Sequence, residues 1–130
     1  MKSITQQLVE SSNGILKIQP EVRDETGHYT MSDDGGVENQ VVMFLYWLVK
    51  ILQPENILET GTYTGISSLY MAAALEDNKH GHLMTLEYER VHQDRAERLW
   101  MACGIGNRVT CKLTSSLDFW PHDTKYDLLF

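Results

Sequence analysis

The chain has 130 residues, of which 42% are hydrophobic and 22% are charged, with 18 acidic and 11 basic side chains and a net charge of -7. These values are typical of one globular domain and exclude a disordered tail, a collagen-like repeat and a multidomain enzyme. A domain of this length buries roughly two thirds of the surface of its unfolded chain. Its two cysteines, Cys103 and Cys111, therefore need not form a disulfide to support folding.

The distribution of charged and apolar residues argues against nucleic-acid and membrane partners. Binding to nucleic acid or an anionic membrane depends on clustered Lys and Arg, whereas the basic residues here are scattered among acidic ones. The N-terminus, MKSITQQLVE, lacks the apolar core of a secretory signal, and the longest apolar run, 41–49, is about half of a membrane span. We therefore expect a cytoplasmic protein with reduced thiols.

Residues 1–36 are predicted to form an N-terminal helix and a lid-like connection. A short helix is compatible with residues 3–12, and residues 13–36 combine glycines with many polar side chains. Residues 37–53 predict a helix that is apolar almost all round and ends before Pro54. Such a helix is expected to be buried rather than half exposed.

Residues 37–130 are predicted to form a second unit, in which strands alternate with helices from residue 56 onwards. Strands are expected at 56–60, 82–87, 108–113 and 126–130, with helices at 65–75 and 91–103 and a helical turn at 117–120. This alternation predicts an α/β fold, a Rossmann-like doubly wound parallel sheet with helices on both faces. Because the last apolar strand would be an unprotected edge, we expect the C-terminal strands to be missing and the chain to be a fragment.

The stretch ILETGTYTGIS (57–67) combines a strand end, a tight turn with two glycines and a helix start. In doubly wound sheets, ligands bind beyond the carboxyl ends of the strands, where glycine lets the backbone approach them closely. Two glycines alone fit a purely structural turn equally well. A binding role is favoured because Glu59 and Glu87 end two successive strands and are expected to face one crevice.

The two carboxylates indicate the kind of ligand. A dinucleotide-binding turn would have glycine at position 63, where this chain has Tyr63, and Glu59 would repel a pyrophosphate. S-adenosylmethionine, which has a diol and a positive charge but no phosphate, suits the crevice better. Glu87 can accept from its ribose hydroxyls, and Glu59 would lie near its ammonium and sulfonium. Ser67, at the helix start, would meet its carboxylate.

The stretch ILETGTYTGISSLYMAAAL resembles motif I of the class I S-adenosylmethionine-dependent methyltransferases, and within them the catechol and caffeoyl-CoA type of small-molecule O-methyltransferase. The segment TLEYERVHQDRAERLWMACGIGNRV is similar to the next strand and helix of that family. The resemblance covers residues 31–130 and implies that Glu87 binds the ribose and Tyr88 flanks the adenine. After the third strand, Thr114-Ser115-Ser116 stands where the family has a glycine motif, and Ser115 is the best match for the adenine contact. The expected cofactor-binding residues are Glu59, Gly61, Thr62, Tyr63, Gly65, Ser67, Glu87, Tyr88 and Ser115.

The resemblance implies an enzyme that transfers a methyl group from S-adenosylmethionine to a hydroxyl of a small molecule, with the cofactor half of the site in this chain. Catalytic residues are not identified. A divalent metal such as Mg²⁺, where the full-length family uses one, would have its ligands outside this chain. A homodimer is a further implication.

Two other interpretations stay open. One is an NAD(P)-type nucleotide-binding oxidoreductase domain, and the other is an inactive module that binds a partner through residues 126–130 or 37–53. His80 and His82 fit a solvent-facing turn better than a metal site. The two cysteines fit core packing better than redox chemistry, because neither has a nearby His or CxxC partner.

Overall fold

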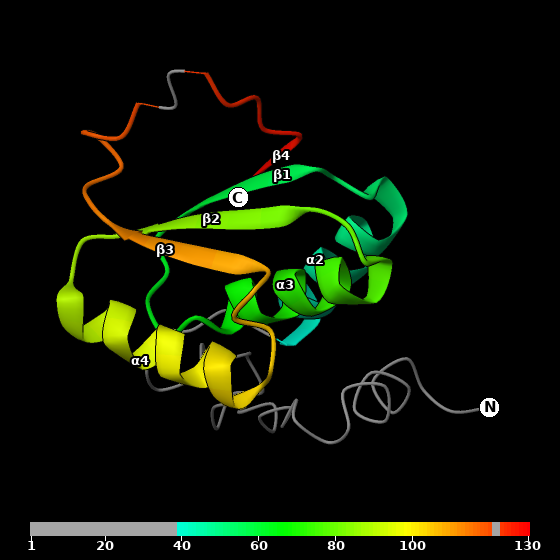
Figure 1. Cartoon of the computed structure of the whole chain (residues 1–130), viewed down its shortest axis with the longest axis horizontal. Coiled ribbons are helices and arrows are strands. Elements are labelled where there is room, and N and C mark those ends of the chain that lie inside the picture. The colour runs from blue at the N-terminus through cyan, green and yellow to red at the C-terminus, as the bar shows by residue number, and fades with distance from the viewer. Residues whose placement is uncertain (1–38, 121–122) are drawn as a thin grey trace, which may run out of the picture.

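The computed structural model describes residues 39–120 and 123–130, so the expected helix and lid-like connection over 1–36 lie outside the described residues. In the described part, parallel strands form one sheet in the order β3-β2-β1-β4 (Figure 1). The strands are β1 (Asn56–Thr60), β2 (His82–Glu87), β3 (Val109–Leu113) and β4 (Leu128–Leu129). The helices are α2 (Asn39–Leu52), α3 (Ile66–Asn78) and α4 (Arg90–Ala102). The predicted parallel α/β fold is confirmed.

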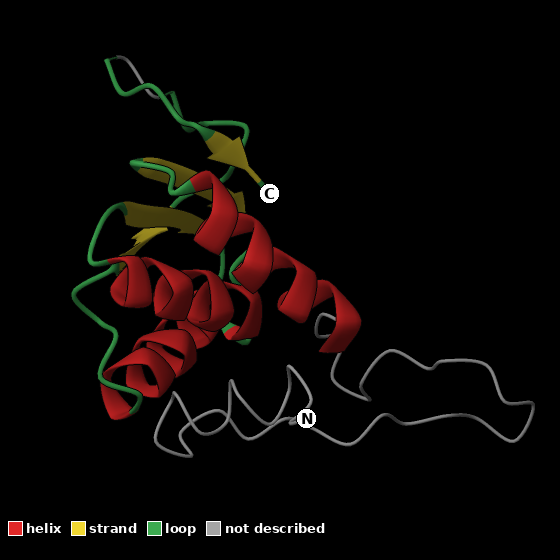
Figure 2. Ribbon diagram, turned by 90° about the vertical axis from the view of Figure 1, so that its right-hand side faces the viewer, coloured by secondary structure: helices red, strands yellow, loops and turns green. Residues whose placement is uncertain are grey.

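The described helices lie on one face of the sheet (Figure 2). The crossovers β1-α3-β2 and β2-α4-β3 run in the same direction, so right-handed connections place both helices on the same side. The connection from β3 to β4 runs back past β2 and β1. Its described residues form a loop, and the helical turn predicted at 117–120 is wrong: the chain makes a turn in which Asp118 N donates to Ser115 O at 3.1 Å. The helices predicted on the second face are therefore not seen in the described residues.

The core lies between the sheet and this layer of helices. Ile57 and Leu83 of the central strands are fully buried, because both strands are paired on two sides and both side chains pack in one cluster with residues of α3. The small side chains of Ala72 and Ala74, also fully buried, let α3 pack closely against its neighbours. Trp100 of α4 completes this core. Among the described residues, no helix is long and apolar enough to span a membrane.

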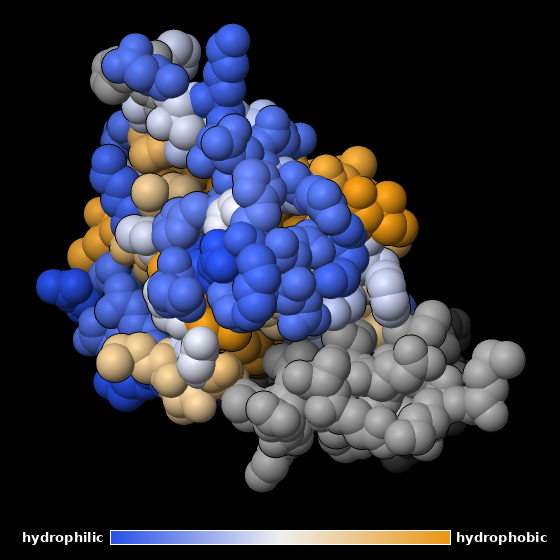
Figure 3. Space-filling model, turned by 45° about the vertical axis from the view of Figure 1, so that its right-hand side comes forward, coloured by the Kyte–Doolittle hydropathy of each residue, from blue (hydrophilic) through white to orange (hydrophobic). Residues whose placement is uncertain are grey.

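Helix α2 is buried on one side only, so the prediction of a buried helix is wrong in the described part. Val42, Leu45 and Val49 pack in the core, because α2 rests mainly on α3. In contrast, Phe44 is 64% exposed and Ile51 is 76% exposed. In Figure 3, hydrophobic side chains reach the surface in patches beside a largely hydrophilic face.

Strand β4 is shorter than the strand predicted at 126–130, but its backbone bonds extend beyond it. Asp127 N donates to Asn56 O at 2.8 Å, and Phe130 N donates to Leu58 O at 2.9 Å. The Asp127 carboxylate also accepts from the backbone N–H of Glu55 at 2.8 Å and of Asn56 at 3.0 Å. These bonds set the register of β4 against β1.

The link between α2 and α3 can be tested by removing one hydroxyl. Tyr46 donates a hydrogen bond to Asp77, and burial together with this carboxylate raises the pKa of Tyr46, which keeps the hydroxyl protonated. Tyr46→Phe is expected to lower the free energy of unfolding by about 1 to 2 kcal/mol in urea denaturation. The same change at Tyr88, which is 73% exposed, should cost less than about 0.5 kcal/mol. Equal stability of both variants would contradict this link.

Candidate functional site

The carboxyl ends of β1, β2 and β3 meet at one edge of the sheet. The turn 61–65 follows β1, residues 88–89 follow β2, and residues 114–115 follow β3. Backbone bonds hold these segments together: Gly61 N donates to Leu86 O at 2.9 Å, and Thr114 N donates to Glu87 O at 2.7 Å. The fold therefore brings the segments that carry the predicted site residues to one edge.

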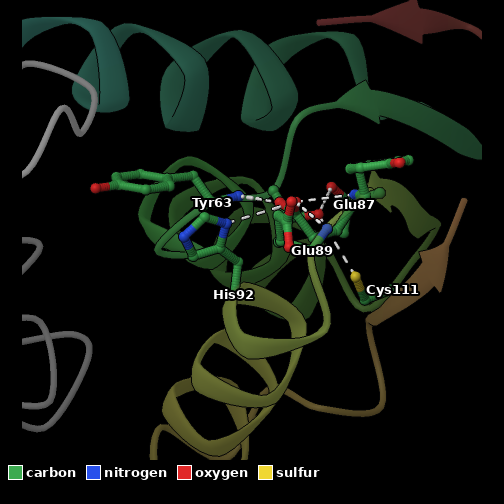
Figure 4. A network of polar contacts seen from close by, with 8 residues as sticks. Tyr63, Glu87, Glu89, His92 and Cys111 are labelled. Carbon is green, nitrogen blue, oxygen red and sulfur yellow. Dashed lines mark hydrogen bonds and ion pairs between the residues drawn. The ribbon is translucent and has the colours of Figure 1, made fainter. Parts of the chain in front are cut away.

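Glu87 is the polar centre of this edge. Its Oε2 accepts from Tyr63 N at 2.7 Å, and its Oε1 accepts from Tyr88 N and Glu89 N, each at 2.9 Å (Figure 4). Burial opposes ionisation, but the backbone N–H groups and His92 outweigh it and lower the pKa of Glu87 below its usual value. The carboxylate is therefore ionised, and the three amides leave part of its roughly four acceptor sites for a ligand.

His92 belongs to this arrangement and was not predicted. Its Nδ1 lies 3.6 Å from Glu87 Oε1, and its ring meets the Tyr63 ring edge to face with centroids 4.8 Å apart. Figure 4 shows the Tyr63 ring extending past His92, away from Glu87. Tyr63 has a left-handed backbone with φ 47°, unusual for a residue with a side chain, and its bond to Glu87 helps to hold it there. In the sequence, His92 could have been identified as a candidate because it is a histidine in the first turn of the helix that follows Glu87.

Glu59 does not face a crevice, so the expectation that both carboxylates line one opening is wrong for Glu59. The residue is 0% exposed, whereas Glu87 is 7% exposed. The hydroxyls of Ser67 and Ser68, in the first turn of α3, donate to the two oxygens of the Glu59 carboxylate. Side chains alternate along a strand, so Glu59 lies on the same face of β1 as the buried Ile57, and the start of α3 encloses it there. In the sequence, Ser68 could have been identified because Ser67 and Ser68 form a polar pair just before the apolar run of the helix.

Thr62 also faces inward. Its Oγ1 lies 2.7 Å from Thr85 Oγ1 and 3.5 Å from Cys111 Sγ, and the Thr62 residue is 2% exposed. A cofactor contact by the Thr62 side chain is therefore not supported. Cys111 is a free and buried thiol whose pKa is raised mainly by burial, as expected for core packing.

The two glycines of the turn have different surroundings. Gly65 begins α3 with φ +76°, and a Cβ there would lie 2.6 Å from Ala96 Cβ. Its carbonyl also accepts from Trp100 Nε1 at 2.9 Å, so Gly65 sets the packing of α3 against α4. Gly61, with φ +86°, has open space where a Cβ would be. Gly61 is thus the glycine that presents backbone at the edge.

The remaining predicted residues lie around this edge. Tyr88 is 73% exposed beside Glu87, and Ser115 is half-buried with its Oγ accepting from Leu117 N at 3.1 Å. Trp120, which the sequence placed on a helix, is exposed in the loop. The Nε2 atom of His82 forms a hydrogen bond with the Thr110 hydroxyl. The described residues contain no cluster of three or more His, Cys, Asp or Glu side chains that could hold a metal ion.

The two glycines make a matched pair for mutation. Both substitutions by alanine strain a left-handed backbone, at roughly 1 to 2 kcal/mol, but only Gly65→Ala adds a collision with α4. We expect Gly65→Ala to lower the free energy of unfolding in urea by at least about 1 kcal/mol more than Gly61→Ala. A larger loss of stability in Gly61→Ala than in Gly65→Ala would show that the contact between α3 and α4 does not require a glycine at position 65.

Glu59 should make stability depend on pH. Burial raises the pKa of Glu59, and the hydroxyls of Ser67, Ser68 and Thr85 offset this only in part. Because the folded pKa lies above the unfolded value near 4.5, the stability from this group is complete below that value and is lost as the pH rises through the folded pKa. Glu59→Gln removes this loss.

The prediction is that the free energy of unfolding of Glu59→Gln improves relative to that of the unmodified chain as the pH rises from about 4.5, in urea denaturation series. Glu55→Gln, the same change in an exposed residue just before β1, serves as the control and should not show this trend. If the free energy of unfolding changes with pH in the same way for all three proteins, the pKa of Glu59 is not raised.

Comparison with known proteins shows that this chain is similar to methyltransferases. A family model described as O-methyltransferase matches residues 9–130. A catechol O-methyltransferase from Niastella koreensis is 37% identical over 78 residues, which are 60% of this chain and 34% of that protein. A caffeoyl-CoA O-methyltransferase from Petroselinum crispum is 28% identical over 100 residues, which are 75% of this chain and 38% of that protein.

A solved structure agrees with these matches. The O-methyltransferase TomG from Streptomyces achromogenes, solved in complex with SAM, has a TM-score of 0.64 and 28% sequence identity, covering 72% of this chain and 44% of TomG. The chain thus spans less than half the length of these relatives. The match over residues 9–130 and the shared parallel α/β fold show that the chain belongs to the O-methyltransferase family.

Proposed function

We propose that this chain forms the cofactor-binding half of an S-adenosylmethionine-dependent methyltransferase that acts on a hydroxyl of a small molecule. The observation that carries the proposal is the Glu87 carboxylate, which is ionised and held by three backbone N–H groups at the carboxyl end of β2. A carboxylate oriented in this way can accept hydrogen bonds from a ribose diol without a further rearrangement.

Each edge residue has a role in this proposal. Glu87 accepts from the ribose hydroxyls, Tyr88 flanks the adenine, and Ser115 lies toward the adenine amino group. The exposed backbone at Gly61 and the N-terminal end of α3 at Ser67 receive the amino-acid part of the ligand, where helix N–H groups favour a carboxylate. Glu59 and Thr62 act from the interior through their hydrogen bonds to Ser67 and Thr85.

S-adenosylmethionine supplies an activated methyl group on its sulfonium, and transfer requires an acceptor oxygen placed in line with it. The residues of this chain hold the donor side of that reaction, and we assign none of them as catalytic. The acceptor side falls to segments that the longer relatives have and this chain does not span. We assign no metal ligand in this chain. We propose that the protein is cytoplasmic and forms a homodimer.

An NAD(P)-type domain is the rival that shares the most features, because an acidic residue at the end of the second strand also suits the ribose of NAD. The spacing of the turn favours the methyltransferase. Gly61 and Gly65 are separated by three residues, and position 63 has a tyrosine in place of the glycine that lets a pyrophosphate approach. Tighter binding of NAD than of S-adenosylhomocysteine in calorimetry would reverse this ranking.

The proposal predicts a specific loss of affinity at Glu87. Titration calorimetry with S-adenosylhomocysteine should give saturable binding, and Glu87→Gln should weaken it by about 10- to 150-fold, because a charge-assisted hydrogen bond contributes roughly 1.5 to 3 kcal/mol. Glu55→Gln, at the opposite end of the sheet, should leave the affinity within about twofold. No binding by the folded chain would contradict the proposed function, and unchanged affinity of Glu87→Gln would remove Glu87 from the site.

A further inference from the structure

Glu59 contacts the start of α3, where the proposed function places the carboxylate of the ligand. Its side chain is 0% exposed, and its partners in the described residues are hydroxyl groups. Ser67 donates to one carboxylate oxygen and Ser68 donates to the other, and both serines lie in the first turn of α3. Thr85 of β2 provides a third hydroxyl. The first turn of α3 therefore rests on this buried carboxyl group.

This arrangement conflicts with an anion at the start of α3. A serine hydroxyl has one proton, and in the ionised state of Glu59 the proton of Ser67 is donated to that carboxylate. A second carboxylate on the outer side of Ser67 would then meet an oxygen without a free proton. Two negative charges would also lie on either side of one hydroxyl, in surroundings that screen them poorly.

Protonation of Glu59 removes the conflict. A neutral carboxyl group has its own O–H, which can donate to one of the surrounding hydroxyl oxygens. The proton of Ser67 is then free to turn outward. By linkage, a ligand that binds better to the protonated form must in turn raise the proton affinity of Glu59.

We propose that Glu59 is a positioning residue that takes up one proton when the carboxylate of the ligand docks at the start of α3, and that this uptake frees the Ser67 hydroxyl to donate to the ligand. The proton comes from the solvent and forms an O–H bond on the Glu59 carboxylate, and no other bond is made or broken. The inference rests on the proposed function, because the ligand is the one proposed there.

The surroundings of Glu59 on each neighbouring element favour uptake. Residues Ser67 and Ser68 of α3 and Thr85 of β2 are neutral, and β4 presents Leu128 and Leu129 beside β1. The titratable group that senses Glu59 from β3 is Cys111, whose pKa the Glu59 charge raises. Burial raises the pKa of Glu59 itself, so its proton affinity is already high before a ligand arrives.

The test is titration calorimetry of this chain with S-adenosylhomocysteine in pairs of buffers that differ in ionisation enthalpy, acetate and MES from about pH 5 to 6 and phosphate and imidazole from about pH 6.5 to 7.5. The dependence of the heat on the ionisation enthalpy of the buffer gives the number of protons taken up. We expect a maximum of about 0.5 to 1 proton for each ligand bound, and an affinity that falls as the pH rises.

Three controls isolate Glu59. The ligand 5′-methylthioadenosine has the adenosine and the sulfur but no carboxylate, so it should bind without proton uptake. Glu59→Gln should bind S-adenosylhomocysteine without uptake and with an affinity that no longer falls with pH, because its amide N–H replaces the carboxyl O–H. Glu55→Gln should take up the same number of protons as the unmodified chain.

The outcomes separate this inference from the proposed function. Failure of the folded chain to bind S-adenosylhomocysteine would overturn both. Binding without proton uptake, or with equal uptake in Glu59→Gln, would overturn the role of Glu59 alone. If Glu59→Gln does not fold, the comparison between S-adenosylhomocysteine and 5′-methylthioadenosine still decides, because equal proton uptake by the two ligands would exclude coupling to the carboxylate.

Discussion

Three backbone N–H groups converge on the carboxylate of Glu87, and the arrangement of the functional edge depends on this convergence. One of them belongs to Tyr63 in the turn after β1, and the other two belong to Tyr88 and Glu89, which connect β2 to α4. Hydrogen bonds to a charged acceptor contribute roughly 1.5 to 3 kcal/mol each, enough to hold Tyr63 in its left-handed backbone. One side chain thus joins the segments that follow two neighbouring strands and presents a negative charge at their edge.

The two carboxylates at the ends of these strands are in opposite physical states. At Glu87, burial is outweighed by backbone N–H groups and His92, which lower its pKa, whereas at Glu59 burial raises the pKa. Environments that shift the pKa values of two acids in opposite directions give the two acids different roles. Glu87 is suited to contact a ligand directly, and Glu59 is suited to act on it through the hydroxyl of Ser67.

Much of the fold and part of the site could be predicted from the sequence. The strand and helix alternation identified the parallel sheet, and the end of a strand at Glu87 located its carboxylate at the functional edge. The sequence did not reveal that Glu59 is enclosed, because alternation along a central strand does not show which polar side chain is covered by the next helix. The exposed side of α2 was missed for a related reason: nine consecutive apolar residues indicate a helix or a span but not how many neighbours it has.

The most direct test of the central claim is a titration of the ¹⁵N-labelled chain with S-adenosylhomocysteine, followed by the chemical shifts of its backbone amides. If the ligand binds at Glu87, the largest changes occur at Tyr63, Tyr88 and Glu89, whose N–H groups bind Glu87, and in the adjoining turn around Gly61. Shift changes centred on α2 or on the opposite end of the sheet, with these amides unaffected, would contradict binding at Glu87.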